Sequence, residues 1–154
     1  MKLTKGILLG SGILFIAIQV IRPVRNQNSQ DLSTDISSVV IIPDTVLTLL
    51  KDACYDCHSN NTNYPWYSNI QPVGWLMAHH IKEAGSELKF SDFGSYSQRK
   101  QLSKLEGIGN SIEDDIMPPM YYKIMHRSAQ LSTAEKLSLI KWVQQSMDSL
   151  SIDR

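Results

Sequence analysis

The segment Cys54-Tyr55-Asp56-Cys57-His58 contains both cysteines of this 154-residue chain. Residues three and four positions apart lie on the same face of a helix. The segment therefore brings two thiols and one imidazole to one side of a single helical turn. Two cysteines separated by two residues and followed directly by a histidine form the attachment pattern of a c-type haem.

The pattern predicts haem c as the cofactor, one per chain and covalently attached. Cys54 and Cys57 can each add to a vinyl group along one edge of the porphyrin and form thioethers. His58, four residues after the first thiol, then reaches the iron as the proximal ligand.

Three haem-free interpretations of the motif remain. A redox dithiol needs a βαβ frame around it, which the flanking sequence does not predict. A zinc site needs more ligands, and the chain has three other histidines and no further cysteine. A disulfide between Cys54 and Cys57 would close a very small loop in an adhesion or scaffold domain.

Helical periodicity surrounds the motif, which makes the predicted fold class all-α, with three to five helices in a small cytochrome c-like domain. A helix begins near Asp44, as a plausible N-cap, and runs into the motif, and two more are expected over residues 73–88 and 95–114. Residues 115–122 contain Pro118-Pro119 and cannot form a regular helix. A capping box at residues 132–135 begins a last helix with an apolar stripe to Leu150.

The distal side of the iron is assigned to Met117. Its thioether is a soft ligand, and the two prolines that follow keep the segment extended. Met120 is the first substitute, and Met125 and His126 are weaker ones. His79 or His80 would give a bis-histidine iron, and of the two His80 faces inward more plausibly.

Aromatic residues after the motif are candidates for the pocket wall, with ordinary core packing as the equal alternative. These candidates are Trp66, Tyr67 and Trp75, together with His80 as a pocket residue. A small basic group, Arg99, Lys100 and Lys104, could guide an acidic redox partner, although a solvated helix face explains it better.

Three segments organise the chain: a signal anchor or transmembrane helix at 1–25, a polar linker at 26–42 and a haem-binding domain at 43–150. Residues 6–21 carry no charge between Lys5 and Arg22 and would span roughly 24 Å as a helix. A cleaved signal peptide and a buried helix are the alternatives. The prediction is a bacterial inner-membrane protein with one pass and its C-terminal domain in the periplasm, since c-type haem is attached outside the cytoplasm.

Charge is balanced, with 15 basic and 15 acidic residues, so a nucleic-acid partner has no global electrostatic support. The expected partners are the cytoplasmic membrane, through the N-terminal helix, and an unidentified redox protein.

The series of motifs over residues 43–145 resembles the bacterial haem-binding domain family, short membrane-anchored relatives of cytochrome c. The matching segments are 54–58 (CYDCH), 63–68 (NYPWYS), 72–75 (PVGW) with His80, 90–93 (FSDF), 116–121 (IMPPMY), 126–132 (HRSAQLS) and Trp142. The resemblance implies covalent haem c, His58 as proximal ligand and Met117 in the family's Met-Pro segment. Asp115-Ile116 stand where the family usually has a glycine before that segment.

The leading functional hypothesis is single-electron transfer by a His/Met-ligated iron. The alternative is a haem-based sensor or gas-binding module whose distal site is labile or open. An enzyme such as a peroxidase is a third hypothesis. It is disfavoured because the chain has a single haem motif, and no distal His–Arg pair can be singled out.

Overall fold

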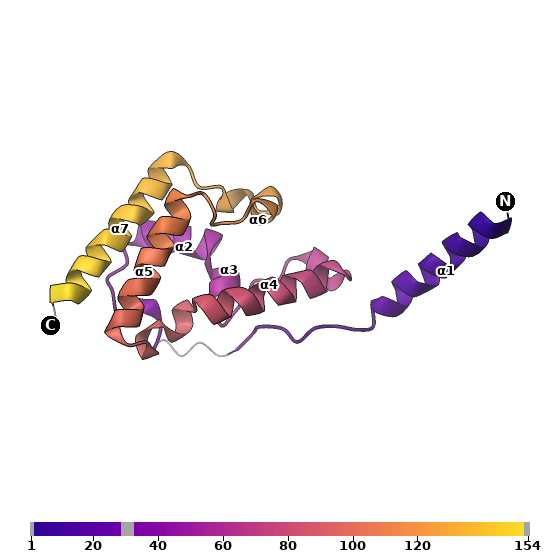
Figure 1. Cartoon of the computed structure of the whole chain (residues 1–154), viewed down its shortest axis with the longest axis horizontal. Helices are drawn as coiled ribbons and strands as arrows, with labels where there is room; N and C mark the ends of the chain where they lie inside the picture. Colours follow the sequence, from indigo (N-terminus) through magenta and orange to yellow (C-terminus); the bar gives the residue numbers. More distant parts are fainter. Residues whose placement is uncertain (1, 29–32, 153–154) are drawn as a thin grey trace.

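The computed structural model describes residues 2–28 and 33–152, and its regular secondary structure there is entirely helical. The α-helices are α1 (Lys2–Ile18), α2 (Asp44–Ala53), α3 (Tyr55–His58), α4 (Val73–Glu87), α5 (Gln98–Glu113), α6 (Met120–Met125) and α7 (Thr133–Ile152) (Figure 1). Four 3-10 turns connect them: η1 (Ile36–Ser38), η2 (Trp66–Asn69), η3 (Phe90–Ser95) and η4 (Arg127–Ala129). The helical class matches the prediction.

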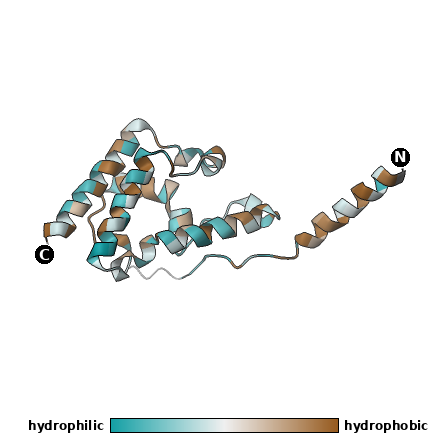
Figure 2. Cartoon of the chain, in the orientation of Figure 1, coloured by the Kyte–Doolittle hydropathy of each residue, from teal (hydrophilic) through white to brown (hydrophobic). Residues whose placement is uncertain are grey.

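The prediction of a transmembrane helix at residues 1–25 is wrong. None of the helices in the described part of the chain combines the length and the apolar character needed to cross a membrane. The N-terminal helix α1 has 17 residues, which rise about 26 Å, while a bilayer core is about 30 Å thick. It extends away from the other helices and is apolar along most of its length (Figures 1 and 2).

The short helices explain why the predicted domain contains six α-helices, α2 to α7, where three to five were expected. The helix predicted to run through the motif is interrupted at Cys54, which separates α2 from α3. A further single turn, α6, begins directly after Pro119, because proline is well tolerated just before the first turn of a helix. Asp44 is the first residue of α2 and not its cap, since Pro43 occupies the N-cap position.

The core lies where α5 and α7 pack along each other and meet α2 and η3 (Figure 1). The predicted capping box begins α7 as expected: the Glu135 carboxylate accepts from the Ser132 backbone N–H at 2.7 Å, and the Glu135 N–H donates to Ser132 Oγ at 3.3 Å. The most deeply buried side chains are Ile36, Leu50, Phe90, Phe93, Leu105 and Leu139. Burying such apolar side chains contributes roughly 1.5–3 kcal/mol each.

The segments before α2 also pack on the helical domain. Gln19 exchanges two hydrogen bonds with the backbone of Gln71, and the indole of Trp75 donates to the carbonyl of Ile21 at 2.8 Å. Ile36 and Val40 are buried in the core. These contacts place part of the N-terminal region against the elements that carry the motif.

Candidate haem site

The two cysteines and His58 are brought together by the turn that follows α2. Cys54 leaves helical geometry, and its carbonyl accepts from the N–H groups of Cys57 at 3.2 Å and His58 at 3.0 Å. Those bonds form the single helical turn that the spacing predicts. Cys54 is both the last capping residue of α2 and the first capping residue of α3, and its non-helical backbone divides the two helices.

Both thiols are free, and burial keeps them protonated. Desolvation raises the pKa of Cys54 to about 12 and that of Cys57 to about 11. Catalytic dithiols of the thioredoxin type need a lowered cysteine pKa instead. The site therefore lacks the electrostatics of a redox dithiol.

The His58 imidazole is fixed in the orientation of a metal ligand. Its Nδ1 lies 2.9 Å from the carbonyl oxygen of Leu88, and since a carbonyl can only accept, Nδ1 carries the proton and donates. This tautomer leaves the Nε2 lone pair available to a metal. Desolvation lowers the pKa of His58, which favours the neutral, ligating form.

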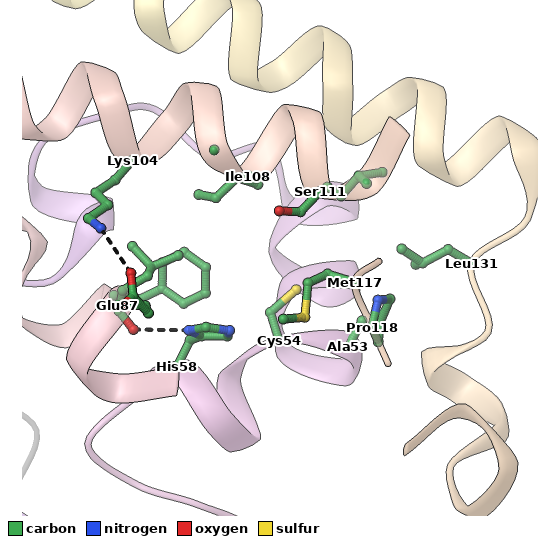
Figure 3. A pocket seen from close by; sticks show the side chains of 14 residues that line it. Ala53, Cys54, His58, Glu87, Lys104, Ile108, Ser111, Met117, Pro118 and Leu131 are labelled. Carbon is green, nitrogen blue, oxygen red and sulfur yellow. Dashed lines mark hydrogen bonds and ion pairs between the residues drawn. The ribbon is translucent and has the colours of Figure 1, made fainter. Parts of the chain in front are cut away.

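A cavity of about 290 Å³ adjoins Cys54 and His58, and we call it the His58 cavity (Figure 3). Its walls are the end of α2, one face of α5, the segment Met117-Pro118 and Leu131. On the α5 wall, a Cβ placed on Gly107 would meet no atom within 4 Å, so the helix backbone is open to the cavity there. The donor set of this mostly apolar cavity, the Cys54 thiol, the His58 imidazole and the Met117 thioether, has the chemistry that a haem requires.

Met117 reaches the His58 cavity because of the way α5 ends. Asp115 has the left-handed backbone conformation, with φ of 57°. The N–H of Ile116 donates to Ser111 and that of Asp115 to Ile112, which is the Schellman pattern of a helix C-terminus. Asp115 takes a conformation that glycine adopts most readily.

Two lysines hold the Asp115 side chain in place. Its Oδ1 lies 2.8 Å from Nζ of Lys136 and 3.1 Å from Nζ of Lys123. Hydrogen bonds from Lys136 and then Lys123 lower the pKa of this carboxyl below its ordinary value. The turn before Met117 is thus tied both to α6 and to the start of α7.

A second cavity, of about 350 Å³, adjoins Cys57, and we call it the Tyr122 cavity. Tyr122 donates to the Asp56 carboxylate at 2.7 Å and stacks on His126, with ring centroids 4.0 Å apart. His126 Nε2 in turn lies 3.2 Å from the Tyr67 hydroxyl. Burial and the neighbouring Asp56 raise the pKa of Tyr122, so it remains a neutral donor.

The two cavities divide the candidate site residues proposed from sequence. His58, Cys54 and Met117 line the His58 cavity, as does Lys104. The Tyr122 cavity is lined by the candidates Cys57, Tyr67, His80, Met125 and His126. His80 stacks on Tyr121 with ring centroids 4.9 Å apart, on a wall of the cavity that does not contain His58.

Among the histidine, methionine and tryptophan candidates, four line neither of these two cavities. Trp66 is 73% exposed and Trp75 bonds to the N-terminal segment. Met120 is also exposed, and His79 pairs with Glu83 at 3.2 Å on the outside of α4. The two tryptophans are therefore not arranged as pocket walls.

Two hydrogen bonds of the site could not be predicted from the sequence. The Leu88 carbonyl that orients His58 is a backbone group 30 residues away, and nothing in the sequence marks it. The Tyr122–Asp56 hydrogen bond joins residues 66 positions apart. The only signal for it was the presence of an acidic residue inside the motif and a tyrosine after the two prolines.

No group of three or more His, Cys, Asp or Glu side chains within the described ranges is arranged to hold a metal ion. The zinc interpretation thus finds no ligand set in that part of the chain.

Comparison with known proteins gives one match. The sequence model of a family described as a haem-binding domain matches residues 13–145, most of the chain. No curated protein and no solved structure matches.

Proposed function

From the premise that this chain belongs to the haem-binding domain family, and so binds haem, we propose that the haem is of the c type and serves single-electron transfer. The observation that carries the proposal is the 2.9 Å contact between His58 Nδ1 and the Leu88 carbonyl. It presents a neutral imidazole with Nε2 free beside two protonated thiols. Haem supplies an iron that changes its charge by one electron.

Covalent attachment uses Cys54 and Cys57. In each case the thiol adds across a vinyl C=C bond, so that one S–C bond forms and the thiol hydrogen passes to the other vinyl carbon. No oxidant is consumed in this addition. The chain's contribution is to hold both thiols on one turn, where a single porphyrin edge can meet them.

The sixth ligand in this proposal is Met117. It lines the same cavity as His58, and the Schellman turn at Asp115 fixes where its backbone begins. Met120 is exposed outside the cavity, and His80 lies on a wall of the Tyr122 cavity. These placements favour Met117 over both alternatives.

One observation supports the second candidate function, a haem-based sensor or gas-binding module. Met117 remains 38% exposed. A ligand that is not locked in the core can leave the iron and open the distal site to a small molecule. Electron transfer is preferred because a thioether ligand next to a fixed histidine suits an iron that keeps both ligands in its two oxidation states.

We place the protein outside the cytoplasm, where c-type haem is attached in bacteria. An electron carrier there also needs a redox partner protein.

The test is to produce the full chain with the c-type haem maturation machinery. A mass increased by one haem, and a pyridine haemochrome spectrum typical of thioether-linked haem after denaturation, are the expected results. Cys54→Ser with Cys57→Ser should release the pigment on denaturation. A colourless protein with the mass of the bare polypeptide would overturn the proposal.

The electron-transfer part has its own readout. The oxidised protein should show the weak red absorption band of methionine–iron bonding and bind no carbon monoxide when reduced. Rapid carbon monoxide binding by the reduced native protein would instead favour the sensor function.

A further inference from the structure

One face of α5 carries charge at the end of the His58 cavity. Lys104, Gly107, Ile108 and Ser111 follow each other at helical spacing, and all four line the cavity (Figure 3). Among the described residues that line it, Lys104 is the one cation and Glu87 the one anion. The other lining residues are apolar or neutral, so the charge is confined to one place.

The Lys104 ammonium is held at the cavity without a strong partner. Its Nζ lies 3.8 Å from Glu87 Oε2, a long ion pair. The Lys104 side chain is 27% exposed and that of Glu87 is 81% exposed. The aliphatic stem of the lysine therefore packs against the wall, while the glutamate can turn into solvent and leave the ammonium to another carboxylate.

The Lys104–Glu87 pair lines the part of the His58 cavity that lies away from Cys54. In Figure 3, His58 lies between Cys54 on one side and Lys104 with Glu87 on the other. A porphyrin joined to Cys54 and ligated by His58 would have to lay its opposite edge along the rest of the cavity lining, in which Lys104 is the one cation among the described residues. Its two propionates are on the part of the macrocycle away from the vinyl groups.

We infer that Lys104 binds a haem propionate, so that the His58 cavity selects a tetrapyrrole that carries a free carboxylate at this edge. The inference rests on the proposed function, because it requires haem in this cavity. Placing a carboxylate at an apolar cavity is costly unless a cation pairs with it. Lys104 supplies that cation, and its ion pair with Glu87 is exchanged for one with the cofactor.

The first test uses the matured holoprotein and measures the midpoint potential of Lys104→Gln. Loss of a positive charge beside the haem stabilises the oxidised iron, so the potential should fall. Lys104→Arg should restore it. Lys100→Gln is the matched control: it removes the same charge from the same helix, but Lys100 lies over the Tyr96 ring, 3.9 Å from its centroid and outside the cavity.

The second test measures recognition of the carboxylate itself. The full chain with Cys54→Ser and Cys57→Ser is titrated with haemin and with haemin dimethyl ester. Lys104→Gln in that background should weaken haemin binding about tenfold, the size of a charge-assisted hydrogen bond. It should leave the affinity for the ester unchanged, since the ester has no carboxylate to lose.

The outcomes separate the two proposals. A matured protein without haem overturns the proposed function and this inference together. If haem is present but Lys104→Gln and Lys100→Gln shift the potential equally, or if haemin and its ester lose the same affinity, this inference alone fails. Should the cysteine-free chain not retain haemin, the potentials of the holoprotein variants decide.

Discussion

The two cavities on either side of the Cys54–Cys57 turn differ in what their walls can do. The His58 cavity has one imidazole, one thioether and one lysine among residues that are mostly apolar. The Tyr122 cavity has a connected set of hydroxyl, imidazole and carboxylate groups that already bond to one another. The proposal assigns the cofactor to the first cavity, whereas the polar groups of the second already form hydrogen bonds with one another.

The thiols mark the boundary between them. Cys54 lines the His58 cavity and Cys57 lines the Tyr122 cavity, although the two are only three residues apart. A porphyrin linked to both must therefore have its vinyl edge along this boundary. We therefore expect substitutions in the His58 cavity to change the visible spectrum of the haem iron. Substitutions in the Tyr122 cavity should mainly change the free energy of unfolding.

The largest expected effect is that of His58→Ala. Removing the His58 imidazole should abolish the low-spin spectrum of the iron, because no other histidine lines the described part of that cavity. His80→Ala, which alters the Tyr122 cavity, should keep the low-spin spectrum. Visible spectra of both matured variants provide the measurement. If the iron stays low-spin in His58→Ala but not in His80→Ala, the iron ligand lies in the Tyr122 cavity and the prediction is wrong.

Met117→Ala should have the next largest effect. The red band of methionine–iron bonding should disappear, and the reduced protein should become able to bind carbon monoxide. Met120→Ala is the matched control three residues away and should retain the band, since Met120 is exposed outside the His58 cavity. If the band follows Met120 instead, the segment after the prolines must fold back to the iron.

Tyr122→Phe tests the role assigned to the Tyr122 cavity. It removes the hydroxyl that donates to Asp56 and leaves a partly buried carboxylate with one donor fewer. Unfolding free energy should fall by about 1–3 kcal/mol, while the visible spectrum stays that of the parent. Denaturant titration of the holoprotein measures the first quantity. An unchanged stability together with an altered spectrum would contradict the assignment of roles to the two cavities.

Asp115→Asn should have the smallest effect, and one that depends on pH. The lysines lower the pKa of Asp115, so its ionised form stabilises the folded state at neutral pH. That contribution is present above the ordinary value of 3.8 and is lost as pH falls through the lower pKa of the folded state. The variant should therefore have a lower Tm than the parent near neutral pH, and this difference in Tm should become smaller as the pH is lowered. A difference that grows in acid would exclude this pairing as its cause.

Sequence periodicity predicted α4, α5 and α7 close to their observed bounds, because apolar residues recur at helical spacing in all three. It failed at Cys54, where the helix breaks inside an apparently continuous pattern. The N-terminal run was judged from its lack of charge, but α1 ends at Ile18, and Gln19 bonds to Gln71 on the helical domain. A residue pattern cannot show where a polar side chain finds a partner far away in the chain.

Haem binding could be predicted from five consecutive residues, because the spacing of two cysteines and a histidine on one turn is a local pattern. The tertiary structure decided which groups meet that turn. The carbonyl that orients His58, the lysine at the cavity edge and the division of the two thiols between two cavities depend on segments tens of residues apart. Such contacts form only when loops close and helices pack together, and the free energy of packing, not local spacing, selects among them.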